Sequence, residues 1–244
     1  MEKIAFTDLN INKPIAQALE EKGFTYATRI QALAYAPVMS GRDLIGLAQT
    51  GTGKTLAYLL PLLRLWKFNK KQEPTFMVVV PTRELVQQVV KSAEEFSAFM
   101  NFKTLGVYGG ANINTQKQQI AEGCDLIVGT PGRLMDLCLT GVLKAKNIQK
   151  LVLDEVDELL DQGFRTQLNN LFDILPEKRQ NLMFSATLSE EVEELIQHHF
   201  RNPLKIEAAS PGTPVEKIEQ QVLACANFYS KRNFLEHFMD QLPA

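Results

Sequence analysis

Short apolar runs alternate along the chain with longer segments in which apolar residues recur at helical spacing. The apolar runs lie at residues 43–48, 76–80, 104–108, 125–129, 150–154, 181–185 and 204–208. Runs of this kind are typical of strands that are buried on both faces, and segments such as 82–100 and 189–200 have the spacing of amphipathic helices. The alternation predicts an α/β fold: a doubly wound, mostly parallel sheet flanked by helices.

The same pattern sets the expected domain boundaries. After Pro203 it gives way to AASPGTPVEK at residues 208–217, whose Ser, Pro, Gly and Thr content is typical of a linker. We therefore expect a large domain at residues 1–208, a linker at 209–219 and the start of a truncated second domain at 220–244. The last segment offers one strand and one helix.

Composition favours a soluble globular protein. Hydrophobic residues make up 45% of the 244, which is enough for a well-buried core. No stretch approaches the roughly 18 to 20 uninterrupted apolar residues of a membrane span. The start of the chain, MEKIAFTDLN, lacks the pattern of a signal sequence. We expect a cytoplasmic monomer that does not contact a membrane.

The charge balance limits how the protein could bind nucleic acid. A net charge of -2 and a pI near 6.0 give no basic excess for binding by bulk electrostatics, so such binding requires a local site. The densest basic cluster is interpreted as a solvated loop; it comprises Arg64, Lys67, Lys70 and Lys71.

Cysteine and histidine spacing gives no sign of a structural metal or a disulfide framework. The cysteines are odd in number, form no CxxC pair, and are expected to be reduced and in or near the core: Cys124, Cys138 and Cys225. The histidines form no ligand set with a carboxylate and are expected at the surface or at helix ends: His198, His199 and His237.

The segment AQTGTGKT at residues 48–55 predicts a phosphate-binding loop. It lies between a predicted strand and a predicted helix, so backbone N–H groups and a helix N-terminus can face an anion, and its glycines leave room for phosphate. Lys54 is expected to contact the β and γ phosphates, and Thr55 to ligate Mg²⁺. The expected nucleotide-binding residues here are Ala48, Gln49, Thr50, Gly51, Thr52, Gly53, Lys54 and Thr55. Ala48 departs from the GxxxxGK[ST] pattern, which has Gly there.

Two adjacent carboxylates follow the predicted strand at residues 150–154. A nucleotide-hydrolysing loop needs an acidic partner at the end of a neighbouring strand, so Asp154 is assigned to Mg²⁺, partly through water, and Glu155 to the attacking water. With Lys54 they form the expected catalytic set. The alternative is that both carboxylates only open the helix EVDELLDQ at residues 155–162.

Further motifs complete an ordered series: Phe24, Gln31, PTREL at 81–85, Gly109-Gly110, TPGR at 130–133, DEVD at 154–157 and SAT at 185–187. Together with the loop at 48–55 they make the chain resemble the DEAD-box RNA helicases over residues 4–208, the family's first RecA-like domain. The resemblance implies an ATP-dependent RNA helicase, which is an RNA-dependent ATPase that uses ATP and Mg²⁺ and needs a second RecA-like domain. It also explains Ala48, because that family commonly has Ala there.

The resemblance assigns an adenine site to the segment before the loop. Gln31 resembles the family's adenine-reading glutamine, and its amide can donate to N7 and accept from the N6 amino group, a pattern that guanine lacks. Phe24 is expected to stack on the adenine with Phe6 as support, and Thr28 to line the site.

Three motifs resemble the family's RNA-contacting loops, and each ends a predicted strand, where doubly wound sheets bind ligands. Backbone N–H groups, hydroxyls and guanidinium groups are expected to hold phosphates and 2′-hydroxyls with little sequence preference. The expected RNA-binding residues are Pro81, Thr82, Arg83, Gly110, Thr130, Gly132 and Arg133. Taken singly, each loop is better explained as a simple strand-ending turn, and only the three together favour RNA contact.

The SAT motif resembles the segment that couples hydrolysis to strand separation. By this resemblance, Ser185 and Thr187 are coupling residues, and Asp157 is expected to hydrogen-bond to their segment. Such a bond would give the metal-side loop a route to the RNA-side loops.

The chain departs from the family pattern at several positions. Val156 replaces Ala in the DEAD motif, Val86 follows PTREL where Ala is common, and Ala27 and Arg29 replace two prolines before Gln31. No segment resembles H-R-x-G-R-x-G-R, so the second domain's arginines are absent. We therefore expect the chain alone to bind ATP weakly, to hydrolyse it very slowly and not to unwind RNA.

Two other classes remain open from the sequence. One is a non-catalytic nucleic-acid or protein-binding scaffold, against which the intact Lys54, Thr55, Asp154 and Glu155 argue. The other is a DNA helicase or translocase of the same fold, against which Gln31, PTREL and TPGR argue. The pathway and the RNA that is acted on are not encoded in these motifs.

Overall fold

The computed structural model describes residues 4–71, 73–208, 222 and 224–240. The chain divides into two units, Met1–Pro211 and Gly212–Ala244. The boundary falls within the segment expected to be a linker, and the assignment of the second unit to another RecA-like domain stays a prediction.

The first unit is built on one parallel sheet of seven strands in the order β3-β4-β2-β5-β6-β1-β7. The strands are β1 (Leu44–Leu47), β2 (Phe76–Val79), β3 (Thr104–Val107), β4 (Leu126–Gly129), β5 (Lys150–Leu153), β6 (Gln180–Ser185) and β7 (Leu204–Glu207). All seven predicted strands are present, and their ends differ from the predictions by about one residue. The predicted fold class is confirmed.

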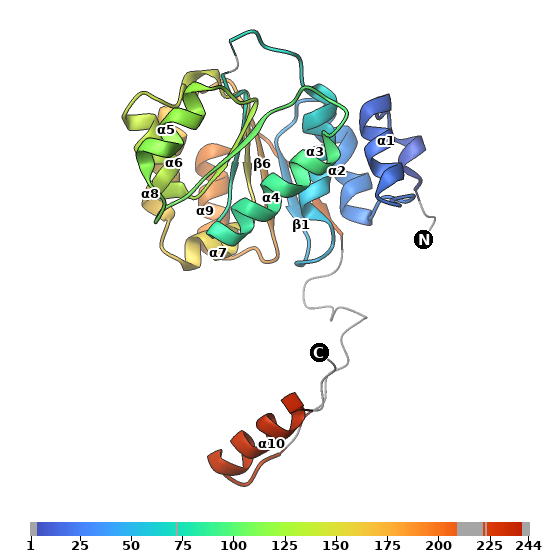
Figure 1. Ribbon diagram of the computed structural model, residues 1–244, viewed down its shortest axis with the longest axis vertical. Helices are drawn as coiled ribbons and strands as arrows, with labels where there is room; N and C mark the ends of the chain where they lie inside the picture. Colours follow the sequence, from blue (N-terminus) through green and yellow to red (C-terminus); the bar gives the residue numbers. More distant parts are fainter. Residues whose placement is uncertain (1–3, 72, 209–221, 223, 241–244) are drawn as a thin grey trace. The chain divides into compact units, whose positions relative to one another are not determined.

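Helices connect the strands and lie on both faces of the sheet (Figure 1). Those of the first unit are α1 (Lys13–Glu21), α2 (Arg29–Met39), α3 (Lys54–Leu65), α4 (Arg83–Phe96), α5 (Ile113–Ala121), α6 (Pro131–Leu139), α7 (Val156–Asp161), α8 (Arg165–Ile174) and α9 (Glu190–His199), with short 3₁₀ turns η1 (Phe6–Asp8) and η2 (Ala145–Asn147). Ser189 caps α9 by accepting a hydrogen bond from the Val192 N–H, and Glu190 follows at the positive helix end.

Successive strand residues point to opposite faces, which creates two cores. Met77 and Val79 of β2 face a cluster shared with α5 to α9, whereas Phe76 and Val78 face a cluster shared with α2, α3 and α4. A third cluster, which includes Ile15, packs α1 against α2, α3 and α4. Because each helix packs on one face of the sheet, the position of the loop that joins it to the preceding strand is fixed as well.

The second unit is described as one helix, α10 (Phe228–Asp240). Several of its aromatic residues are exposed, among them Phe228, Tyr229 and Phe238. The strand predicted before this helix falls mainly on residues 209–221 and 223, outside the described residues.

The cysteine prediction holds for two residues and is wrong for the third. Cys124 and Cys138 are buried, and burial raises the pKa of their thiols to about 12 and about 11. Cys225 is exposed in the second unit. Burial was expected of all three cysteines alike, and their spacing in the sequence cannot distinguish core from surface when the packing partner of a segment is unknown.

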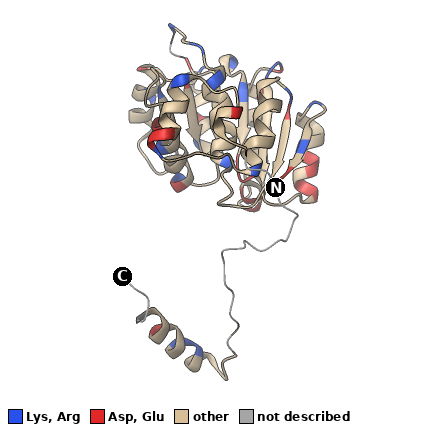
Figure 2. Ribbon diagram, turned by 90° about the vertical axis from the view of Figure 1, so that its right-hand side faces the viewer, with Lys and Arg blue, Asp and Glu red and all other residues tan. Residues whose placement is uncertain are grey.

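The histidines and the basic cluster lie largely where they were expected. His198 and His199 end α9, but the His199 ring is stacked on Phe172 with 3.9 Å between centroids, so it is a packing residue as well. Lys67, Lys70 and Lys71 are exposed on the loop before β2, and the ribbon of this loop is partly blue, the colour of Lys and Arg, in Figure 2.

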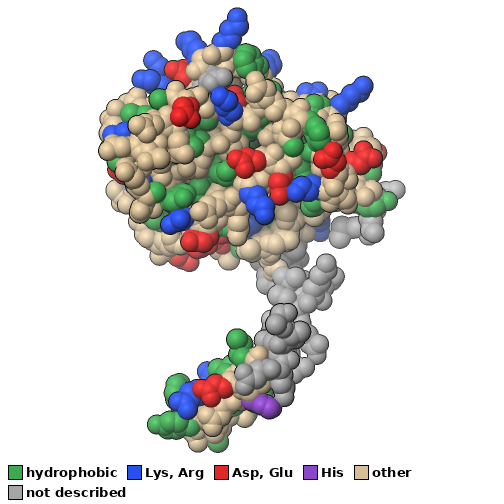
Figure 3. Space-filling model, viewed as in Figure 1, with side chains coloured by type: hydrophobic (Ala, Val, Ile, Leu, Met, Phe, Trp, Pro, Cys, Tyr) green, Lys and Arg blue, Asp and Glu red, His purple; other side chains and the backbone are tan. Residues whose placement is uncertain are grey.

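Charges of both signs are interspersed with polar and apolar side chains over the face of the first unit that Figure 3 shows. No helix among the described residues is long and apolar enough to cross a membrane.

Candidate nucleotide and RNA site

The loops that carry the predicted motifs all lie at one edge of the sheet, because all strand pairs are parallel. The phosphate-binding loop follows β1, Ser185 ends the adjacent β6, and Asp154 follows β5, next to β6. The segments PTREL, TPGR and Gly109-Gly110 follow β2, β4 and β3, which form the other half of the sheet. The strand order therefore separates the predicted nucleotide motifs from the predicted RNA motifs along a single edge.

The loop at residues 48–55 has the backbone conformation that an anion cradle needs. Gly51 and Gly53 have φ values of 81° and 91°, a region that glycine enters without steric cost. The Thr52 hydroxyl donates to the Gln49 carbonyl at 2.7 Å and closes the turn. Lys54 is the first residue of α3, so the N-terminus of that helix opens toward the loop.

Ala48, the first residue of the loop, directly follows β1 and continues its hydrogen bonding to β6. Its side chain is buried in the core, and its N–H donates to the Ser185 carbonyl at 3.0 Å. A small side chain fits this position, and the bond joins the phosphate-binding loop directly to the SAT motif. The departure from Gly at this position therefore does not disturb the loop.

The Lys54 side chain is positioned to bind an anion. Its side chain is only 6% exposed, and among the described residues its buried ammonium has no hydrogen-bond partner. A buried ammonium group without partners is costly unless a ligand supplies them. Phosphate oxygens in the adjacent loop would do so.

Gln31 connects the predicted adenine segment to the phosphate-binding loop. Its Oε1 accepts from the Thr28 N–H at 2.9 Å, and its Nε2 donates to the Gly53 carbonyl at 3.1 Å. Thr28 caps α2 in the same arrangement. The amide keeps a second N–H and a second oxygen lone pair, which is the capacity that adenine recognition requires.

Phe24 and Phe6 differ in exposure. Phe24 is 44% exposed, with its ring edge-on to Phe96 at 5.7 Å, so one face is free for stacking. Phe6 is buried in the cluster beneath α1. It supports this region through packing, and the adenine contact itself stays a prediction for Phe24.

Asp154 is buried and held on both oxygens. Its Oδ2 accepts from the Tyr58 hydroxyl at 3.0 Å, and its Oδ1 accepts from the Glu155 N–H at 3.0 Å. Burial raises the pKa of the carboxyl above its ordinary value, while the charge of Lys54 lowers it. The carboxylate therefore has a fixed orientation.

Glu155 has an unusual backbone conformation, with φ 52° and ψ 53°. Left-handed geometry is uncommon outside glycine and is often found at functional positions. Burial, followed by a hydrogen bond with Glu158, raises the pKa of Glu155 to about 7. A carboxyl with a pKa near neutrality suits proton transfer at physiological pH.

These residues fit Mg²⁺ bound together with a nucleotide. Mg²⁺ in such sites takes one or two protein oxygens and completes its shell with phosphate and water. Thr55 and Asp154 supply a hydroxyl and a carboxylate here. Among the described residues no cluster of three or more His, Cys, Asp or Glu could hold a metal alone, as expected for a site in which the nucleotide supplies ligands.

The residues predicted to bind RNA surround the end of the β2-β4-β3 half. Arg83 is exposed, and its guanidinium lies 4.8 Å from the centroid of the Tyr108 ring. Gly110 has φ 79°. Thr82 caps α4 through a hydrogen bond from the Leu85 N–H, and Thr130 precedes α6, so two helix N-termini open at this edge.

The Arg133 guanidinium hydrogen-bonds to other groups of the protein. Its side chain is 10% exposed, Nη1 donates to the Gln116 Oε1 at 2.6 Å, and Nη2 donates to the Ala111 carbonyl at 3.0 Å. This places Arg133 as a link between TPGR and the segment after Gly109-Gly110. Its direct contact with RNA stays a prediction.

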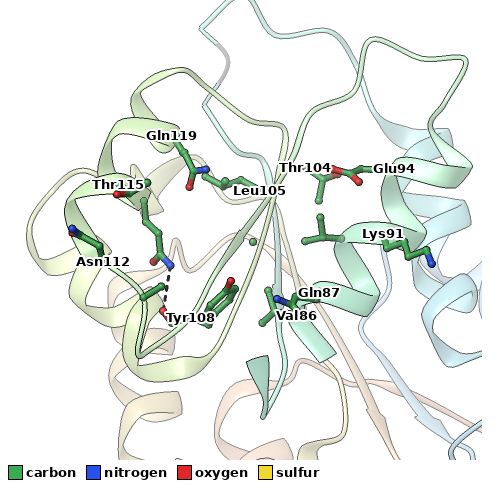
Figure 4. A pocket seen from close by; sticks show the side chains of 14 residues that line it. Val86, Gln87, Lys91, Glu94, Thr104, Leu105, Tyr108, Asn112, Thr115 and Gln119 are labelled. Atoms are coloured by element: carbon green, nitrogen blue, oxygen red, sulfur yellow. Dashed lines mark hydrogen bonds between the residues drawn. The ribbon is translucent and has the colours of Figure 1, made fainter. Parts of the chain in front are cut away.

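Gln116 is a site residue that the sequence reasoning missed. It is buried on α5, and its Nε2 also donates to the Tyr108 carbonyl at 3.3 Å. The bond is drawn in Figure 4, where α4, β3 and α5 surround a hollow of about 580 Å³. A signal was present: Gln116 interrupts the apolar stripe formed by Ile113 and Ile120.

The predicted coupling contact is confirmed. One oxygen of Asp157, in the first turn of α7, accepts from the N–H groups of Ala186 and Thr187 at 3.1 and 3.0 Å and from the Thr187 hydroxyl at 3.1 Å. Ser185 is fully buried, and its hydroxyl has no partner among the described residues. The segment after Asp154 is thus bonded to the end of β6.

The parallel sheet and the glycine loop that opens α3 beside a buried carboxylate define a RecA-like P-loop nucleotide-binding domain. The family model described as DEAD/DEAH box helicase matches residues 28–195. The chain belongs to this family.

Relatives and solved structures agree. The chain is 40% identical over 209 residues to DEAD-box ATP-dependent RNA helicase 9, mitochondrial, from Arabidopsis thaliana, covering 84% of this chain and 34% of that protein. It is 37% identical to ATP-dependent RNA helicase RhlB from Vibrio parahaemolyticus, covering 91% and 53%. A crystal structure of a DEAD box protein from Methanococcus jannaschii superposes with a TM-score of 0.81 at 31% identity, covering 86% and 57%. The chain thus spans about a third to a half of these two relatives.

Proposed function

We propose that this chain is the N-terminal motor domain of an ATP-dependent RNA helicase, which binds Mg-ATP and the RNA backbone and unwinds short duplexes when paired with a second RecA-like domain. The observation that carries the proposal is the buried Lys54 ammonium, which has no hydrogen-bond partner among the described residues and lies beside a preformed glycine loop. Family membership and the named RNA helicases among its relatives support it.

Each residue at the nucleotide half has a role in this proposal. Lys54 and the N–H groups of the loop hold phosphate oxygens, Gln31 reads adenine, and Phe24 stacks on it. Thr55 and Asp154 hold Mg²⁺, which, when bound, neutralises charge on the β- and γ-phosphates. Glu155 orients the attacking water and accepts its proton.

The RNA half acts through phosphate and sugar contacts. Exposed Arg83 and the N-termini of α4 and α6 hold the backbone, while Arg133 and Gln116 fix the loop after Gly110. The hydrogen bonds from the Ala186–Thr187 segment to Asp157, with the Ala48–Ser185 bond, join the SAT segment to α7 and to the phosphate-binding loop within the nucleotide half. Closure of a second domain supplies the missing catalytic groups.

Nucleotide binding is tested by the thermal unfolding of the chain with Mg-ATP and with Mg-GTP. A ligand that binds only the folded state stabilises it by RT ln(1 + [L]/Kd), so ATP at about 100 times its Kd adds about 2.7 kcal/mol. We expect stabilisation by ATP, little by GTP, and none by ATP in Lys54→Ala. Equal stabilisation by both nucleotides would remove the adenine-reading role from Gln31.

RNA preference is tested by fluorescence anisotropy with single-stranded RNA and DNA of one sequence. Preference for RNA is expected because 2′-hydroxyl contacts are lost with DNA. Equal binding favours the DNA helicase alternative. Failure to gain RNA-stimulated ATPase when a second domain is restored favours the scaffold alternative.

A further inference from the structure

The Tyr58 hydroxyl is bonded to one of the two groups that we assign to Mg²⁺. Tyr58 is on α3, three residues after Thr55, and it donates to the Asp154 Oδ2 at 3.0 Å. This bond joins the helix that follows the phosphate-binding loop to the carboxylate at the end of β5.

Tyr58 is rigid in this position. It is 0% exposed, and its ring packs against Phe184 of β6 with 5.4 Å between centroids. The aromatic core thus fixes a donor at the carboxylate.

A phenylalanine would satisfy the packing alone. Tyr58 belongs to the apolar cluster that also contains Leu62, Leu182 and Phe184. A buried hydroxyl is costly there unless it is bonded, and it is bonded to a predicted metal ligand, Asp154. The polar atom therefore has a use at the metal-binding edge that core packing does not explain.

We propose that Tyr58 is a positioning residue for Mg²⁺, which orients Asp154 so that the metal and the nucleotide bind together. The inference rests on the proposed function. With Oδ1 bonded to the Glu155 N–H and Oδ2 bonded to Tyr58, Asp154 cannot rotate, and one free lone pair on each oxygen remains for the metal or its water.

The test measures ATP affinity of the whole chain by calorimetry at several Mg²⁺ concentrations and with EDTA. Tyr58→Phe should weaken ATP binding about three- to tenfold with Mg²⁺, the range expected for loss of one ordinary hydrogen bond, and should leave the affinity in EDTA unchanged. The matched control is Tyr35→Phe, which also removes a buried hydroxyl, one that donates to the Asn10 carbonyl at 2.7 Å. It should leave both affinities unchanged.

A double-mutant cycle tests whether Tyr58 acts through Asp154. In the Asp154→Asn background, Tyr58→Phe should cause no further loss of Mg²⁺-dependent affinity. A loss of the same size in both backgrounds, an equal loss in EDTA, or wild-type behaviour of Tyr58→Phe would each overturn the inference. If the wild-type chain itself shows no Mg²⁺-dependent ATP binding, the proposed function fails instead.

Discussion

At the scale of single residues, the candidate site is distinguished by groups whose burial or backbone conformation is energetically unfavourable. In the part of the chain that the structure describes, the buried ammonium of Lys54 has no hydrogen-bond partner, and Glu155 is held in left-handed geometry between a buried strand and α7. Such features persist only where the surrounding structure enforces them. Both lie at the nucleotide half of the sheet edge, where the proposed function uses them.

Glu155→Gln should separate binding from hydrolysis. The amide keeps the size and the left-handed backbone position but cannot accept a proton, so Mg-ATP should still stabilise the chain. In a protein that includes the second domain, RNA-stimulated turnover should fall by about 10²- to 10⁴-fold. Asp161→Asn, which alters an exposed carboxylate on the same helix, is the control. Retained stimulation in Glu155→Gln would show that another group activates the water.

At the scale of elements, the site depends on contacts between segments far apart in sequence. The start of α2 is joined to the phosphate-binding loop through Gln31 and Gly53. On the other half of the edge, α5 and α6 are joined through Gln116 and Arg133. Each contact fixes one loop against a neighbouring helix, so its loss should loosen one half of the edge only.

Gly53→Ala should destabilise the chain more than Gly51→Ala does. Both residues have positive φ, which costs about 1–2 kcal/mol for a residue with a Cβ. At Gly53 a Cβ would also lie 2.4 Å from the Gln31 Nε2, whereas at Gly51 it meets nothing within 4 Å. Chemical denaturation without nucleotide measures the difference. Equal losses would mean that Gln31 moves aside without cost.

Gln116→Ala should lower both stability and RNA affinity. It removes the partner of the Arg133 Nη1 and of the Tyr108 carbonyl, and a buried group left unpaired costs about 1–3 kcal/mol. Denaturant unfolding and RNA anisotropy are the readouts, with ATP binding expected to stay unchanged. Gln119→Ala, on an exposed position of the same helix, should alter none of these. An RNA affinity equal to that of the wild type would confine Gln116 to a structural role.

At the scale of the whole molecule, strand order decides which motifs meet. β5, β6 and β1 are neighbours, so Asp154, Ser185 and the phosphate-binding loop lie together, while β2, β4 and β3 carry the RNA motifs. The described residues of this chain form one such edge. In the proposed function, a second domain must close over it before the site is complete.

RNA-stimulated hydrolysis should therefore require a second domain. The chain alone should show ATPase activity that RNA does not increase, and covalent addition of a second RecA-like domain should raise turnover at least about 10³-fold, the scale of an arginine supplied to phosphoryl transfer. Steady-state phosphate release with and without RNA measures this. Multiple-turnover, RNA-stimulated hydrolysis by the chain alone would contradict the proposal.

The sequence by itself determined the elements and the chemistry of the site. Apolar runs located all seven strands of the sheet because strands that are buried on both faces consist mostly of apolar residues. The loop at 48–55 could be predicted to bind phosphate because its glycines, lysine and threonine are adjacent in the chain. Asp157's contact with the SAT segment followed from the family resemblance.

Only the tertiary structure decided which side chains form hydrogen bonds with one another. The Tyr58–Asp154 bond spans 96 residues, and the Gln116–Arg133 bond joins two helices through a residue whose sequence signal, a polar position in an apolar stripe, does not name its partner. Strand order, which no local pattern encodes, creates both contacts by bringing α3 beside β5 and α5 beside α6. Hydrophobic periodicity reports which face of an element is buried, but the partner that it meets depends on how the whole sheet is ordered.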